Sequence, residues 1–157
     1  MKFLLSKDLE YSRLLTNLMV GVCAALFFYL GLDILLHGYV LGTDITSVVN
    51  TLYGNMEEFI EPILIDTLLL QVHIDLFMSL FTIMIITSIY IRLYQTHKYT
   101  KWLVHLIFIL GLAAPIFLII AYYTSLGFVY AWVVSFLFGH LLAMLLALLV
   151  IKRLLFK

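Results

Sequence analysis

The chain has 157 residues, of which 65% are hydrophobic and only 11% are charged, and its formal net charge is zero. Soluble domains carry about a quarter charged residues and about half apolar ones. This composition therefore excludes a water-soluble globular domain and favours an integral membrane protein. The single cysteine, Cys23, excludes an intrachain disulfide bond. No contiguous basic face exists beyond three short clusters, so we expect no nucleic-acid partner.

The basic residues predict how often the chain crosses the bilayer. They form three clusters separated by long apolar stretches: Lys2, Lys7 and Arg13; Arg92, Lys98 and Lys101; and Lys152, Arg153 and Lys157. Loops rich in Lys and Arg stay on the cytoplasmic side of a membrane. Each apolar stretch must therefore leave the cytoplasm and return, which predicts four crossings and cytoplasmic N- and C-termini. We expect a bacterial inner membrane protein with an acidic outer surface, because most of the acids lie in the first stretch.

The first crossing is predicted over residues 14–36, and a short helix is predicted at the outer face over residues 44–53. The apolar residues of this short helix recur at i, i+3, i+4 and i+7: Ile45, Val48, Val49 and Leu52. Such a stripe is suited to lying on the membrane surface. Thr43 or Asp44 can cap the helix at its N-terminus, and Gly54 can end it in the left-handed conformation.

The remaining crossings are predicted over residues 63–91, 102–122 and 128–151. The turn between the last two is short, so these two helices are expected to be antiparallel neighbours. The fold class that follows is an all-α polytopic membrane protein. Residues 1–157 are expected to form one domain, a four-helix up-down bundle with a short amphipathic helix at the outer face.

The last predicted helix carries a ridge of small residues. They are spaced by four: Ser135, Gly139, Ala143 and Ala147. Lipid supplies no hydrophobic drive for helices to associate, so helices in a bilayer pack by close approach through small residues. We therefore expect this ridge to contact another helix, either within the chain or in a partner subunit.

Two of the histidines within the predicted crossings are candidate ligands of a haem. At 1.5 Å per residue from the nearest basic cluster, they lie at different depths. His73 and His140 form the best pair for the two axial ligands of one b-type haem, although their depths differ by about 10 Å. The alternative is that each imidazole makes hydrogen bonds between helices.

A second interpretation is a metal site at the outer face. Asp33 and His37 are four residues apart and share one face of the first helix, and Asp66 lies near the same interface on the second. Histidine with carboxylates suits zinc, iron or copper, so these three residues are candidate metal ligands. The alternative is that water at the interface satisfies all three side chains.

Asp75 points to a partner subunit. It lies about 200° around its helix from His73, so the two side chains cannot share a face. Whichever of them faces outward meets lipid or another protein, and an ionised group facing hydrocarbon is unfavourable. We therefore expect Asp75 to face a partner subunit.

These observations leave three hypotheses of function. The first is a small accessory or anchor subunit of a larger membrane complex, not catalytic by itself. The second is a single-haem subunit of respiratory or other electron-transfer machinery that uses His73 and His140. The third is a proton or ion pathway, or a metal-handling protein, that uses the intramembrane histidines and aspartates. The sequence has no phosphate loop, no nucleophile elbow and no large extramembrane domain, so we do not expect an enzyme in its own right.

Overall fold

The structure, a computed structural model, describes residues 13–156. These residues form five helices and no strand: α2 (Arg13–Val40), α3 (Ile45–Tyr53), α4 (Ile65–Leu93), α5 (Thr100–Tyr123) and α6 (Leu126–Leu155). All but α3 are long and apolar enough to cross a membrane. The all-α fold class and the predicted set of four spanning-length helices are therefore confirmed. Three residues of the basic clusters that were predicted to be cytoplasmic lie outside the described part of the chain: Lys2, Lys7 and Lys157.

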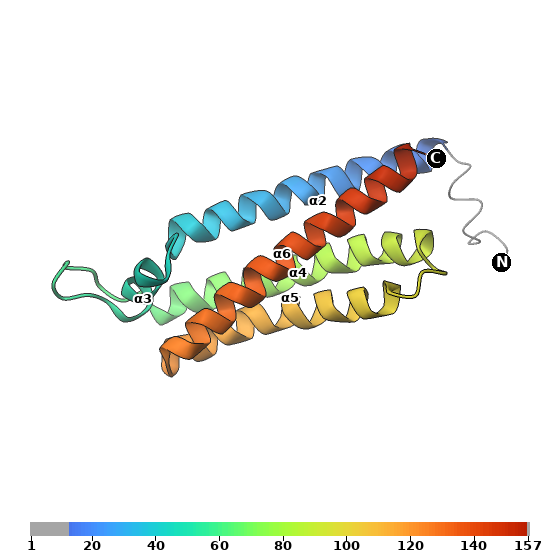
Figure 1. The fold of residues 1–157 in the computed structure, drawn as a ribbon. Coiled ribbons are helices and arrows are strands. Elements are labelled where there is room, and N and C mark those ends of the chain that lie inside the picture. Colours follow the sequence, from blue (N-terminus) through green and yellow to red (C-terminus); the bar gives the residue numbers. More distant parts are fainter. Residues whose placement is uncertain (1–12, 157) are drawn as a thin grey trace.

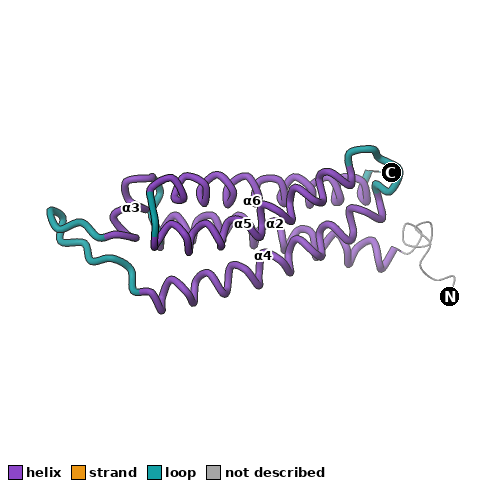
Figure 2. The backbone as a smooth tube through the Cα atoms, turned by 90° about the horizontal axis from the view of Figure 1, so that it is seen from below, coloured by secondary structure: helices purple, strands orange, loops and turns teal. Residues whose placement is uncertain are grey.

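The four long helices lie side by side, and the two ends of the molecule differ (Figure 1). At one end, called here the α3 end, α3 and the loop after it connect α2 to α4. At the other end, called the termini end, lie the start of α2, the α4–α5 connection and the end of α6 (Figures 1 and 2). Helix α6 is central, because it contacts each of the other four helices.

The small-residue ridge of α6 explains this central position. Its four members are all buried: Ser135, Gly139, Ala143 and Ala147. A Cβ atom placed on Gly139 would lie 3.4 Å from the Cβ of Leu110 on α5, so a side chain larger than a methyl group would press on Leu110. The ridge therefore packs inside the chain, which is one of the two contacts that the sequence predicts.

Helix α3 begins where the sequence predicts but packs differently. Asp44 is its N-cap and accepts a hydrogen bond from the Ser47 backbone N–H. Gly54 has a positive φ of 80°, but its ψ of 165° is extended rather than left-handed helical. Val48 and Leu52 are buried among core residues of the bundle. Much of the apolar stripe thus covers protein, where the sequence predicted contact with the membrane surface.

Two apolar cores divide the bundle along its length. The first, the termini-end core, includes Cys23, Leu30 and Ala143. The second, the α3-end core, includes Val72 and Phe136, with Ile34 packed against it. On α2, Asp33 falls between Leu30 and Ile34, and on α6, His140 falls between Phe136 and Ala143. Ionisable side chains therefore occupy the layer between the two cores.

Candidate functional site

Five polar side chains from three helices meet in this layer and are called here the polar cluster. They are Asp33 and His37 of α2, Gln71 and Asp75 of α4, and His140 of α6. The aspartates and histidines are buried, and Gln71 is partly buried. Burial of so many ionisable groups is costly unless they are paired and hydrogen-bonded. Every member has a partner within the cluster.

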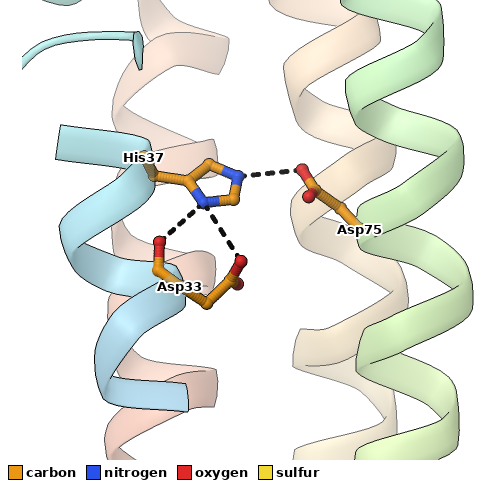
Figure 3. A group of neighbouring side chains, drawn as sticks. All are labelled: Asp33, His37 and Asp75. Atoms are coloured by element: carbon orange, nitrogen blue, oxygen red, sulfur yellow. Dashed lines mark hydrogen bonds and ion pairs between the residues drawn. The ribbon is translucent and has the colours of Figure 1, made fainter. Parts of the chain in front are cut away.

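His37 connects α2 to α4. Its Nδ1–H donates to the backbone carbonyl of Asp33 at 2.9 Å, because a carbonyl oxygen can only accept. The opposite ring nitrogen, Nε2, lies 2.9 Å from Oδ2 of Asp75 (Figure 3). A single proton shared between Nε2 and Oδ2 gives each of these two atoms a hydrogen-bond partner. The carbonyl bond therefore fixes the ring so that Nε2 faces the carboxylate.

His140 and Gln71 bind the outer oxygens of the two carboxylates. The Nδ1–H of His140 donates to the Phe136 carbonyl at 2.8 Å, and its Nε2 lies 2.8 Å from Oδ2 of Asp33. Gln71 Nε2 donates to Oδ1 of Asp75 at 2.8 Å. Each aspartate therefore has one oxygen held by a third residue. The other oxygen is left on the side of His37, 3.6 Å from Nδ1 for Asp33 and 2.9 Å from Nε2 for Asp75.

The bond from a histidine to the carbonyl one turn earlier is not by itself a sign of function. His105 makes the same bond, from Nδ1 to the Lys101 carbonyl at 2.6 Å, and is exposed. The two buried histidines differ because their Nε2 atoms face carboxylates from other helices. The distinguishing feature of the site is therefore the set of interhelical contacts, and the orientation of each ring is a local helical effect.

Three residues of the cluster are arranged so that they could hold a metal ion. Asp33, His37 and Asp75 each offer one ligand atom, and these atoms lie within 4.8 Å of one another. Ligand atoms around a tetrahedral ion bound at about 2.1 Å are roughly 3.5 Å apart. To bind one ion, the three atoms would have to move to about this separation.

A cavity of about 20 Å³ adjoins this group, with Asp75, Ser79, Ser135 and His140 among its lining residues. This volume is enough for about one water molecule, and the polar lining offers it partners. Of the three candidate ligands, Asp75 lines this cavity, so there is space for one small molecule beside Asp75.

Aromatic rings enclose the histidines on the α6 side. The ring centroid of Phe136 lies 4.3 Å from that of His37 and 4.1 Å from that of His140. Trp132 adds a second ring, 6.4 Å from His37. These contacts exclude solvent from both imidazoles and strengthen electrostatic interactions within the cluster.

The predicted haem ligands are not brought together. His73 is exposed, and it lies on the other side of α4 from Asp75. His140 faces the interior, where both of its ring nitrogens already have partners. A haem held by His73 and His140 would require α4 to rotate and the His140–Asp33 contact to break.

The predicted metal ligands are brought together in part. Asp33 and His37 lie in the cluster, but Asp66 is exposed and accepts only the neighbouring Thr67 backbone N–H. Asp75, rather than Asp66, lies beside Asp33 and His37. It faces the interior of the chain, whereas the sequence analysis assigned it to a partner subunit. The reason is that His37 and Gln71 together satisfy its carboxylate.

Sequence reasoning missed the pairing of Asp75 with His37, yet a signal for it exists. Gln71 and Asp75 are four residues apart, as are Asp33 and His37. Each pair therefore presents two polar groups on one helical face. Two such faces on consecutive helices favour a shared contact.

Comparison with known proteins gives no match, whether to a protein-family model, to a curated protein or to a solved structure.

Proposed function

We propose that this chain is an integral membrane protein that binds a divalent transition metal ion through Asp33, His37 and Asp75. The observation that carries the proposal is the convergence of three ligand atoms, each from a residue with a second atom held by another partner. Ligands of metal sites are oriented in this way by outer-shell hydrogen bonds. One imidazole with two carboxylates suits zinc, iron(II) or manganese(II) better than copper(I), which prefers sulfur.

The surroundings of the cluster support a binding site open to one face more than a pathway across the membrane. Between the cluster and the termini end, the buried side chains of residues 13–156 that carry polar atoms are Thr82, Thr87, Thr100, Tyr90 and Cys23. None of them is an Asp, Glu, His, Lys or Arg. A proton or ion pathway would need ionisable or hydrated groups to continue through this half.

For the membrane arrangement, we propose an up-down bundle with the termini end in the cytoplasm and α3 at the outer face of a bacterial inner membrane. The support is the distribution of charge. Arg92, Lys98, Lys101, Lys152 and Arg153 all lie at or near the termini end, where retention in the cytoplasm is expected. The metal site then lies in the half of the bundle nearer the outer face.

The role as an accessory subunit of a larger membrane complex stays a prediction. The apolar residues exposed on the four long helices contact lipid or other subunits equally well. Electron transfer through a haem has less support, because His73 and His140 face different ways. Migration of the detergent-solubilised complex in a native gel above the mass of one chain would support the subunit role.

The metal proposal is tested by titration of the full-length protein. The protein is purified in detergent, stripped with a chelator and titrated with Zn²⁺ or Mn²⁺, and bound metal is counted by mass spectrometry. We expect one ion per chain, and we expect Asp75→Asn to weaken binding by at least 100-fold, since it removes a ligand. Asp66→Asn is the matched control, because it removes an exposed carboxylate from the same helix.

A second pair of variants distinguishes the loss of a ligand from misfolding. His37→Gln should lose the ion, and His73→Gln, which changes an exposed histidine, should retain it. Helix content from circular dichroism must be equal in all four variants. Equal metal binding by Asp75→Asn and Asp66→Asn would overturn the proposal.

A further inference from the structure

A second cavity, of about 640 Å³, lies at the α3 end between α2, α3 and α6. Its walls are mainly apolar and aromatic, and include Ile34, Val48, Trp132, Val133 and Phe136. Its polar side-chain groups are those of buried His37 and of exposed Tyr39, Thr43 and Asp44, together with the indole N–H of Trp132. The cavity therefore combines an apolar body with polar groups at its inner and outer ends.

The volume of this cavity indicates the size of its occupant. Small-molecule sites in proteins have volumes of about 300–1,000 Å³, apolar walls and a few placed polar groups. A helix with its side chains is about 10 Å across and rises 5.4 Å per turn, so fewer than two turns would fit. The cavity matches a small molecule better than a helix of a partner protein.

The residues at the rim indicate where the occupant comes from. Leu35 of α2 is 70% exposed and Leu137 of α6 is 40% exposed, and both line the cavity. In a membrane these side chains face lipid. No Lys or Arg lines the cavity, so it offers no counter-charge to an anion, and the apolar walls disfavour a hydrated ion.

We propose that this cavity binds a neutral, lipid-soluble ring compound that carries carbonyl or hydroxyl oxygens, of the quinone or phenol class. A flat ring packs against the aromatic wall of Trp132 and Phe136. The ring oxygens lie toward the exposed end of the cavity, where the hydroxyls of Tyr39 and Thr43 can donate hydrogen bonds, because both ring nitrogens of His37 already have partners. This inference goes beyond the metal site and needs no bound ion.

The chain contains a reporter for this binding. It has two tryptophans, of which Trp132 lines the cavity and Trp102 is exposed at the termini end of α5. In Trp102→Phe protein, the only indole fluorescence comes from Trp132. Quinones quench indole fluorescence on contact, so a decyl-substituted benzoquinone serves as the probe.

The test is a titration of chelator-treated Trp102→Phe protein in detergent with this quinone. We expect saturable quenching, and at least tenfold weaker binding when Val133→Phe fills the cavity. The matched control is Val134→Phe, because Val134 is the next residue of α6 and is 64% exposed. It should bind the quinone as tightly as the parent. Thermal unfolding is the second measurement: the quinone should raise the unfolding temperature of the parent and of Val134→Phe, but not that of Val133→Phe.

Three results would overturn the inference. The first is quenching of Trp132 that rises without saturation. Such quenching is expected from quinone dissolved in the micelle, and Trp132→Phe protein, in which only Trp102 fluoresces, provides the reference for it. The second is equal binding by the two phenylalanine variants. The third is displacement of the quinone by a saturated ten-carbon alcohol at equal concentration, which would assign the cavity to an acyl chain. Because the protein is metal-free throughout, failure here is distinguishable from failure of the metal proposal.

Discussion

At the scale of single residues, the site depends on how the atoms of each side chain are shared. His37 places one ring nitrogen on a backbone carbonyl and the other near a carboxylate. Asp33 and Asp75 each give one oxygen to a third residue. A cation bound by the inner atoms would therefore find its ligands already oriented, which reduces the entropy lost on binding.

The outer partners should contribute measurably to metal affinity. We predict that His140→Gln weakens metal binding by about 10–100-fold, which is the usual effect of losing an outer-shell partner. His105→Gln is the matched control, because His105 makes the same bond to its own helix but is exposed. Metal titration measures both. A loss as large as that of Asp75→Asn would instead make His140 a direct ligand.

Asp44 should make the start of α3 sensitive to pH. Its carboxylate accepts hydrogen bonds from the hydroxyl and the backbone N–H of Ser47, at 2.6 and 3.0 Å, and these bonds lower its pKa. A lowered pKa means that the ionised cap stabilises the folded helix above the ordinary pKa of aspartate. This stabilisation is lost as the pH falls through the lowered value. Amide exchange of residues 45–53 should therefore accelerate, relative to the intrinsic rate, in acid.

Asp44→Asn is the control for this prediction. Asparagine is also a good N-cap but does not titrate, so its α3 should show protection that does not depend on pH over the same range. Asp44→Ala should show weak protection at every pH. If the parent and Asp44→Asn respond alike to acid, the pH dependence arises elsewhere.

The sequence allowed part of the site to be predicted at this scale. The i, i+4 spacing of Asp33 and His37 places both on one face of a helix, and the structure brings both into the cluster. The third carboxylate was assigned to Asp66, whereas Asp75 occupies that place. Both residues lie on α4, and the choice between them depends on how far α4 is rotated. The i, i+4 spacing of Gln71 and Asp75 carries the sequence signal for this rotation, whereas the spacing of Asp66 and His73, at i, i+7, favours a different face.

At the scale of helices, the hydropathy and charge of the sequence made the long helices predictable. Long apolar stretches bounded by charge define the crossings, so the bounds of α2, α4, α5 and α6 agree with prediction within a few residues. The number of spanning-length helices follows directly from hydropathy. Hydropathy does not indicate which face of each helix is buried. Helix α6 is the exception, because its small-residue ridge identifies the buried face.

The α5–α6 contact at Gly139 should be intolerant of larger residues. We predict that Gly139→Val destabilises the protein by about 1–3 kcal/mol, because a side chain there would press on Leu110 and separate the helices. Unfolding of the detergent-solubilised protein, followed by circular dichroism, measures the change. Gly21→Val on α2 is the matched control, since nothing lies within 4 Å of a Cβ there. Equal stability of the two variants would contradict the proposed role of the ridge.

At the scale of the whole molecule, the orientation in the membrane can be tested directly. The single cysteine is first removed as Cys23→Ala, and a cysteine is then introduced at one of two turns. Ser125→Cys, between α5 and α6, should react with a membrane-impermeant maleimide on intact cells. Lys98→Cys, between α4 and α5, should react only after the cells are permeabilised, because basic turns are retained in the cytoplasm.

The opposite labelling pattern would reverse the orientation of the chain and place the polar cluster nearer the cytoplasm. Labelling of both turns on intact cells would contradict the single crossing of α5 that separates them. Cys23 is buried, and Cys23→Ala deletes a single sulfur atom, so the cavity that it leaves is small.

The termini-end core has one further consequence. Among residues 13–156 its buried side chains include no Asp, Glu, His, Lys or Arg. A charge bound at Asp33, His37 and Asp75 would therefore meet a dielectric barrier on that side. The fraction of sites that hold an ion would therefore depend on the solution on one side of the membrane and not on the solution on the other side. A protein built in this way is suited to sensing or storing what arrives from one side, and would dissipate no gradient while doing so.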